Sequence, residues 1–265
     1  MIVAGRVFEF SMLVAFVTLT LVLISRARKY RKYRPIRSIP ALDAVKEAVG
    51  RCTEMGRPIH WTAGDTARLA SDSAPQVIAG LTILSYVAGL AAEYKVPLIC
   101  TVGGEAGGGP DIIPLIEQTV RDAYTAKGVP ADYKQENIRF ISGERAVYGL
   151  TAAVEAVRNK VGANIMTGAL AASVFMIAEQ LHATGAITIS GTGRSVMIAP
   201  LVCVSDYVLI GEELFAAGAK LSQEPDQLGS IFAQDLAKGF VIALILAGLV
   251  LTAVGSTAIQ SLLNF

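Results

Sequence analysis

Histidine and cysteine are scarce in this sequence, which has only two histidines and three cysteines among 265 residues. Two histidines exclude a multi-histidine metal site. Cys52, Cys100 and Cys203 are far apart in the chain, so no pair of them has the spacing of a metal or redox motif. We interpret all three as reduced core residues, and we predict no metal site and identify no cofactor.

Charge is absent from two long stretches, which run from Phe10 to Ser25 and from Gly239 to Phe265. At 1.5 Å per residue the first stretch makes about 24 Å of helix, which approaches the thickness of a hydrocarbon core. We therefore predict a transmembrane helix in residues 1–25 and a second one, with a short tail, in residues 238–265. A single folded domain is expected between them, at residues 41–237.

The segment between the first span and the domain, residues 26–40, is strongly basic. Positive charge beside a span stays in the cytoplasm, so we predict that both termini lie outside the cell membrane and that the domain is cytoplasmic. Because the charges follow the apolar run, a cleaved signal peptide is disfavoured. The charges either act as a topology signal alone or contact anionic lipid headgroups. The residues expected at the headgroups are Arg26, Arg28, Lys29, Arg31, Lys32 and Arg34.

The remainder of the chain is acidic. Positions 38–265 carry 15 basic residues against 21 acidic ones. A domain with this balance is a poor match for a polyanion, so we predict no nucleic-acid partner.

Short apolar runs alternate with helical segments throughout the predicted domain. The expected strands lie at 58–64, 97–104, 138–143, 163–168, 186–192 and 206–213. They show no alternation of polar and apolar residues, which is typical of a parallel sheet buried on both faces. We predict an α/β fold with a Rossmann-like, mostly parallel sheet and helices on both faces. The apolar segment 76–94 is expected as a buried helix, with a membrane-dipping helix as the alternative.

Three stretches of the chain resemble one family of proteins. They are MGRPIHWTAG near residue 60, SDYVLIGEELFAAGAKLS at 205–222 and GSIFAQDLAKGF at 229–240. With the leading span, they are similar to prokaryotic two-span membrane proteins catalogued only as a domain of unknown function. The resemblance covers nearly the whole chain and implies the same topology. It implies no activity and no site residue.

Glycines and hydroxyl side chains gather where the predicted strands end, which is the edge at which parallel sheets bind ligands. The sequence SGTGRS at 190–195 leads from a strand into a helix and is expected to offer backbone N–H groups and a guanidinium to an anion. The alternative is a tight turn with a solvated arginine. The expected ligand-binding residues are Gly191, Thr192, Gly193, Arg194 and Ser195, together with Gly103 and Gly104.

Other polar residues support weaker interpretations. The loop GGEAGGGPD at 103–111 lacks the GxGxxG and Walker spacings, so its glycines fit positive φ angles at least as well as phosphate binding. Four acids, Asp65 and Asp72 after the first strand and Glu212 and Glu213 at the end of the last, either share a crevice or are solvated loop acids and helix N-terminal charges. His60 is expected in the core beside Trp61.

Two functions are consistent with these features. The first is a membrane-anchored scaffold or assembly subunit that forms homo-oligomers, favoured by the two tethers and by many small residues suited to close packing. The second is a sensor or enzyme that binds a nucleotide or phosphorylated metabolite at the glycine-rich strand ends. No catalytic set is identified in the sequence. A transporter is the least favoured class, because neither span contains a buried charge to mark a pathway.

Overall fold

The computed structural model describes residues 7–30, 36–104 and 109–254. The chain forms two compact units, of which the larger comprises Ile36–Ser222 and the smaller comprises Met1–Pro35 and Gln223–Phe265. The domain boundary expected at residue 237 therefore differs from the end of the larger unit. The reason is local, because Pro225 begins a helix that continues without interruption past Lys238 to Ala253.

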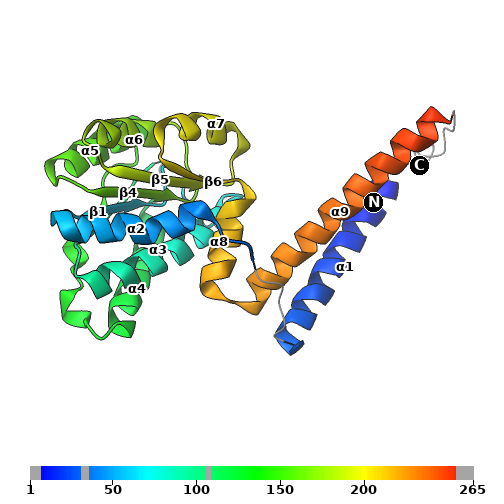
Figure 1. The fold of residues 1–265 in the computed structure, drawn as a ribbon, viewed down its shortest axis with the longest axis horizontal. Helices are drawn as coiled ribbons and strands as arrows, with labels where there is room; N and C mark the ends of the chain where they lie inside the picture. Colours follow the sequence, from blue (N-terminus) through cyan, green and yellow to red (C-terminus); the bar gives the residue numbers. More distant parts are fainter. Residues whose placement is uncertain (1–6, 31–35, 105–108, 255–265) are drawn as a thin grey trace. The chain divides into compact units, whose positions relative to one another are not determined.

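The larger unit is an α/β domain built on a parallel sheet (Figure 1). Its strands are β1 (Ile59–Thr62), β2 (Leu98–Val102), β3 (Ile138–Phe140), β4 (Ala163–Thr167), β5 (Ile187–Thr192) and β6 (Tyr207–Ile210). All six strands expected from the sequence are present. They lie in the order β3-β2-β1-β4-β5-β6, and every neighbouring pair is parallel. The order reverses between β1 and β4.

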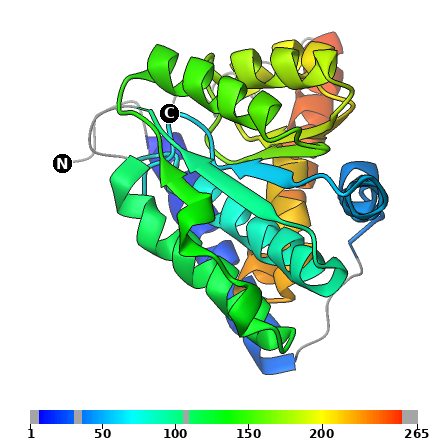
Figure 2. The same ribbon diagram turned by 90° about the vertical axis from the view of Figure 1, so that its left-hand side faces the viewer.

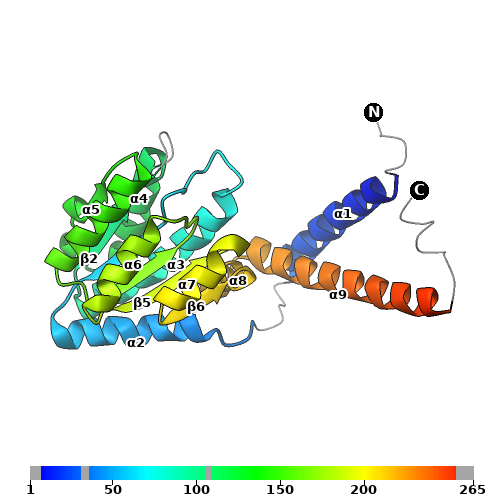
Figure 3. The same ribbon diagram turned by 90° about the horizontal axis from the view of Figure 1, so that it is seen from above.

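Helices cover both faces of the sheet, as expected (Figures 2 and 3). One layer consists of α2 (Pro40–Met55), α3 (Ala74–Tyr94), α4 (Gly109–Ala126) and α8 (Glu212–Ser222). The other consists of α5 (Arg145–Arg158), α6 (Val174–Ala183) and α7 (Ser195–Val204). Two short 3-10 turns, Pro130–Asp132 and Gln135–Asn137, precede β3.

The two faces of the sheet differ in polarity. Toward α2, α3, α4 and α8 the strands present apolar side chains such as Trp61 and Ile165. Toward α5, α6 and α7 they present buried polar groups, among them His60, Thr101 and Asn164. Because alternate residues of a strand point to opposite faces, one short strand contributes to both environments.

The apolar helix α3 belongs to the α/β domain. Its side chains Ile83, Leu84 and Val87 are fully buried in the larger core cluster. Even so, α3 is one of three described helices long and apolar enough to cross a membrane, the others being Phe8–Lys29 and Pro225–Ala253. More than half of the most apolar window of α3 is buried, whereas those windows in the other two helices are 0% buried. Burial in the core therefore accounts for the apolar character of α3.

The smaller unit is an antiparallel pair of helices, α1 (Val7–Tyr30) and α9 (Pro225–Ala253) (Figure 1). At one end, Arg28 donates from Nε and Nη2 to the two carboxylate oxygens of Asp226, at 2.6 and 2.5 Å. Further along, Gly229 packs against the backbone of Ile24, where a Cβ would lie 3.0 Å from the Ile24 Cα. A glycine at this position lets the two helices approach closely.

The uncharged runs of α1 and α9 are offset along the helix pair. The rings of Phe16 and Phe240 meet edge to face with centroids 6.3 Å apart. From that level, the first charged residue toward the Arg28 end is Arg26, ten residues away on α1, and Lys238, two residues away on α9. At 1.5 Å per residue, the two uncharged runs therefore end about 12 Å apart along the helix pair. Asp235 and Lys238 thus lie alongside the uncharged run of α1, where they form an ion pair at 3.4 Å.

Candidate functional site

The reversal of strand order places the candidate site at the carboxyl ends of β1 and β4. In an open parallel sheet the loops after such neighbouring strands diverge, and ligands bind in the crevice between them. Here the loop after β1 begins at Ala63, and the loop after β4 begins at Gly168. Residues 105–108, in the loop after β2, lie outside the described residues.

A buried carboxylate joins the loops after β1 and β4. Asp65 accepts hydrogen bonds from the backbone N–H of Ala171 at 2.6 Å, from the backbone N–H of Ser173 at 3.3 Å, and from the Ser173 hydroxyl. Beside it, the Thr66 hydroxyl donates to the Ala169 carbonyl at 2.7 Å. Asp65 is fully buried, so it is not a solvated loop acid. These hydrogen bonds hold the segment that leads into α6 against the loop after β1.

Glycines allow these loops to pack closely. A Cβ on Gly104 would lie 1.7 Å from the Asp65 carbonyl oxygen, and a Cβ on Gly64 would lie 2.4 Å from that of Ala169. Gly103 packs on the ring of Tyr148, with a Cβ position 2.1 Å from its Cδ2. Gly104 also has φ of 108°, which disfavours any other residue. Gly103 and Gly104 are therefore required for packing, whatever else they contact.

The second expected element, Gly191–Ser195, lies at the end of β5. The side-chain oxygen of Gln76, on α3, accepts from the Gly193 N–H at 3.1 Å and from the Thr192 hydroxyl at 3.2 Å. The Arg194 N–H donates to Thr192 Oγ1 at 3.3 Å. Two backbone donors expected to bind an anion are thus engaged within the domain. Ser195 is exposed at the start of α7.

The two groups of expected ligand-binding residues lie on opposite sides of the strand reversal. Gly103 follows β2 and Gly193 follows β5, and β1 and β4 lie between them. Three strand spacings amount to about 14 Å, so the structure does not bring the two groups into one small site. Glu213, expected near Asp65, instead accepts from Arg37 at 2.6 Å and from the Ile210 N–H at 3.3 Å.

The basic residues expected at lipid headgroups are described only in part. Arg26, Arg28 and Lys29 occupy the last turns of α1, and Arg28 binds Asp226 as described above. Arg31, Lys32 and Arg34 lie outside the described residues.

A buried polar network on the α5 side of the sheet was not predicted from the sequence. The His60 ring joins the Asn164 side-chain oxygen at 2.8 Å through Nδ1 and the Thr101 hydroxyl at 2.7 Å through Nε2. With a carbonyl oxygen facing Nδ1, the proton lies on Nδ1 and Thr101 donates to Nε2. The Tyr148 hydroxyl continues the network to Thr62 at 2.6 Å. These residues lie in short apolar runs on four different elements, so no local pattern indicated them.

Burial controls ionisation in this network. It lowers the pKa of His60 from 6.5 to about 4, although the hydrogen bond to Asn164 opposes the change. It also raises the pKa of Tyr148 to about 12, with smaller opposing contributions from the bonds to Thr101 and Thr62. Both side chains are therefore neutral at physiological pH. As expected, His60 is a core residue beside Trp61.

The stability of the domain should fall in mild acid because of His60. Between pH 6.5 and about 4 the unfolded state binds a proton at this residue and the folded state does not. The unfolding free energy should therefore decrease by about 3 kcal/mol as the pH falls through this range. Denaturant titrations at pH 7 and pH 4.5 can follow the fluorescence of Trp61, the only tryptophan in the chain.

The control for this pH dependence is the other histidine. His60→Gln should remove most of the acid sensitivity, whereas His182→Gln, at an exposed position, should leave it unchanged. Equal acid sensitivity in His60→Gln and the unmodified chain would contradict the assignment.

Two neighbouring atoms of the polar face have no partner in the described part of the chain. They are the Asn164 side-chain nitrogen and the Thr188 hydroxyl, both of them buried. Asn164 and Thr188 are opposite each other in the register of β4 and β5. Within the ranges that the structure describes, no group of three or more His, Cys, Asp or Glu residues is arranged to hold a metal ion.

The cysteines differ in part from the expectation. Cys52 and Cys100 are buried in the core, but Cys203 is exposed on α7. Burial raises the pKa of the Cys52 thiol to about 11 and raises that of Cys100 further. Cys203 was predicted in the core because its neighbours in the sequence are apolar. In the structure it lies on a helix face that is exposed although it is apolar.

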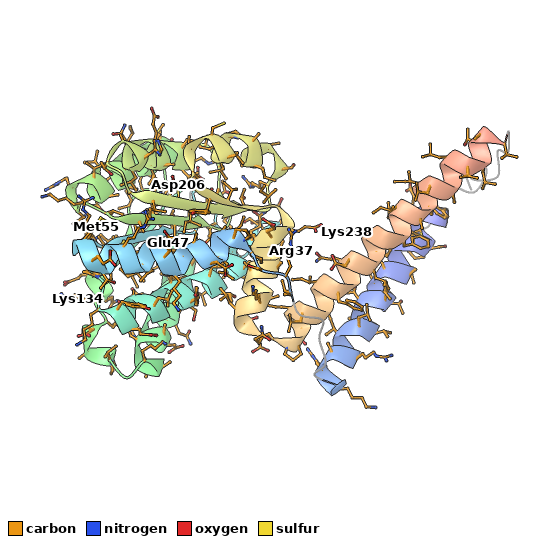
Figure 4. The ribbon with its side chains drawn as sticks, in the orientation of Figure 1. Arg37, Glu47, Met55, Lys134, Asp206 and Lys238 are labelled. Atoms are coloured by element: carbon orange, nitrogen blue, oxygen red, sulfur yellow. The ribbon has the colours of Figure 1, made fainter. Side chains whose placement is uncertain are left out.

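A shallow hollow lies at the end of the sheet opposite the candidate site. Its volume is about 290 Å³, and its lining includes Glu47 and Arg51 of α2 with Asp206 and Tyr207 beside β6. Figure 4 labels two of the lining residues, Glu47 about midway along α2 and Asp206. Glu47 binds Arg51 at 2.6 Å, and Asp206 accepts from the Thr188 N–H at 2.7 Å. The polar groups of this hollow are thus engaged with each other and with the sheet.

A family model described as a domain of unknown function, DUF6754, matches residues 1–263. No curated protein and no solved structure matches the chain.

Proposed function

Because the chain belongs to this family of unknown function, we propose a function from its structure: a membrane-anchored α/β domain that self-associates as a scaffold or assembly subunit. The anchor is the pair α1 and α9, and the associating part is the domain Ile36–Ser222. The two spans carry both termini outside the cell membrane and hold the domain in the cytoplasm. Arg26, Arg28 and Lys29, with the basic residues that follow, then face anionic headgroups.

The length and composition of the helix pair support the anchor. The two helices run antiparallel, and their most apolar windows contain no residue buried within the protein. Apolar surface of this extent is stable in lipid and costly in water. The Asp235–Lys238 pair lies beside the uncharged run of α1, and mutual neutralisation lowers its cost at the bilayer edge.

Self-association is supported by the outer surface of the α5–α6–α7 layer. This layer exposes large apolar side chains on all three of its helices, most of them on α5, whereas α2 and α4 expose mainly charged and small residues. The exposed residues are Val147, Leu150, Val154 and Val157 on α5, Met176 on α6, and Val196 and Val202 on α7. Apolar surface gathered on one side of a domain marks a contact with another molecule. Tethering to a membrane raises the local concentration of the same chain, which favours homo-oligomers.

The mass of the particle in mild detergent tests this function. We expect the full chain to be at least dimeric at micromolar concentration, with a mass, corrected for bound detergent, that is a multiple of the chain mass. Cross-linking in native membranes should give the same number of subunits. A monodisperse monomer under both conditions would contradict the proposal.

A nucleotide or phosphometabolite site is the second candidate function. The parallel strand order, with its reversal between β1 and β4, supports a Rossmann-like doubly wound fold, in which such ligands bind at the reversal. The loop packing around Asp65 and the bond from Gly193 to Gln76 weigh against it. A panel of nucleotides that leaves the melting temperature unchanged would eliminate this candidate.

A further inference from the structure

Helix α5 has two apolar faces. The inner face, with Tyr148, Ala152 and Ala156, is buried against the sheet and α6. The outer face carries larger aliphatic side chains, and they are exposed to 48% at Val147, 58% at Leu150, 57% at Val154 and 36% at Val157. Since a surface helix ordinarily needs one apolar face, the second one requires a separate explanation.

The outer residues have the spacing of a coiled-coil seam. Val147, Leu150, Val154 and Val157 follow one another at intervals of three, four and three residues. These are the a and d positions of two heptads, with valine at a and leucine then valine at d. A narrow seam of this kind accommodates one partner helix, because a and d side chains insert between those of a facing helix.

The charges at the ends of the seam select a second copy of α5 in antiparallel orientation. Arg158 is the last residue of α5 and occupies an e position, and Glu144, two heptads earlier, is the N-cap just before the helix, where its side chain also accepts from the Ala146 N–H. Both are exposed. A parallel copy would face e positions with g positions, which are Ala146 and Ala153 in this helix, so neither charge would gain a complementary partner. An antiparallel copy places Glu144 of each chain near Arg158 of the other, which gives two complementary pairs.

The same arrangement also matches the apolar residues. An antiparallel copy pairs Val147 with Val157 and Leu150 with Val154, twice each. Thr151, midway between Glu144 and Arg158, then lies close to its own counterpart. The contact is therefore isologous, as a two-fold dimer requires.

We propose that α5 forms a homodimer interface by packing antiparallel against α5 of a second copy, with the two-fold axis passing near Thr151. This interface rests on the self-association proposed above and specifies where it occurs. The other exposed side chains of the layer, on α6 and α7, lie beside it and are available to extend the contact.

A charge exchange in the full chain tests the pairing. Glu144→Arg and Arg158→Glu should each weaken the dimer about tenfold, because each places like charges together at both ends of the seam. The double variant Glu144→Arg/Arg158→Glu should restore the dissociation constant to within about threefold of the unmodified chain. A double variant weaker than both single variants would overturn the proposal. Trp61 fluorescence reports whether each variant is folded.

A matched pair of apolar substitutions separates this interface from self-association in general. Val154→Glu lies in the seam, and Ile78→Glu lies at a similarly exposed position on α3, in the other layer. Val154→Glu should yield monomers at concentrations where the unmodified chain and Ile78→Glu are dimeric. An oligomeric Val154→Glu would refute the α5 interface and leave self-association standing. A monomeric unmodified chain would refute both.

Disulfide trapping tests the orientation. In a chain with Cys203→Ser, the variant Thr151→Cys should form an intermolecular disulfide when isolated membranes are treated with copper–phenanthroline as oxidant, because an antiparallel pair brings the two Thr151 positions together. Val147→Cys should not cross-link to itself, since its two copies lie about 15 Å apart along an antiparallel pair. Cross-linking through Val147→Cys and not through Thr151→Cys would indicate a parallel pair and overturn the proposal.

Discussion

Replacing Asp65 by alanine is expected to lower the unfolding free energy of the α/β domain by about 4 kcal/mol. The substitution leaves three donors without an acceptor, namely the N–H groups of Ala171 and Ser173 and the Ser173 hydroxyl. Hydrogen bonds to a charged group contribute about 1.5–3 kcal/mol each, and buried orphaned donors add a desolvation cost. Asp65→Asn keeps one acceptor oxygen and should lose about half as much. Urea titrations monitored by Trp61 fluorescence provide the measurement.

The control for Asp65 is the exposed acid Asp72 in the same loop. Asp72→Ala should change the unfolding free energy by no more than about 0.5 kcal/mol, as is usual at exposed positions. If Asp65→Ala proved as mild as Asp72→Ala, the carboxylate would not hold the two loops together. Asp65 would then be open to a role in binding.

Replacing Gly104 by alanine is expected to destabilise the domain by a similar amount, about 4 kcal/mol. Two costs combine at this position. The added Cβ would lie 1.7 Å from the Asp65 carbonyl oxygen, a rigid backbone atom, so the two loops must separate. The φ of 108° also penalises any residue with a Cβ. Overpacking costs about 1–3 kcal/mol and a left-handed conformation about 1–2 kcal/mol.

A substitution at Gly128 distinguishes the cost of the backbone conformation from the cost of the close contact. It too has positive φ, at 77°, but no atom lies within 4 Å of the position of its Cβ. Gly128→Ala should therefore carry only the conformational cost, about 1 kcal/mol. Equal destabilisation by the two substitutions would show that the close approach of Gly104 to Asp65 is absent in solution.

The strands and helices of the domain were largely readable from the sequence. Short apolar runs bounded by glycine and proline predicted all six strands within a few residues, because most residues of the four central strands are buried on both faces and are apolar. Three polar residues are exceptions to this pattern. His60, Thr62 and Thr101 are polar and lie within such runs, and only their hydrogen bonds to Asn164, to Tyr148 and to one another explain how they are satisfied.

The location of the candidate site was predicted from the sequence, but the contacts made by its residues were not. The glycines at the strand ends lie where the sequence placed them. Whether Gly104 approaches a ligand or another loop depends on Asp65, which is distant in sequence from it. In the same way, Gln76 reaches the N–H of Gly193 from a helix that precedes it by more than a hundred residues. Contacts of this kind leave no local pattern.

By itself, the sequence determined the alternation of strands and helices, the parallel class of the sheet and the uncharged runs of α1 and α9. These features depend on the spacing of apolar residues and charges along the chain, which is local information. Only the tertiary structure decided that the boundary of the domain lies at Ser222 and that α5 has an exposed second apolar face. Both faces of α5 are apolar in sequence, so which one is buried follows from packing against the sheet.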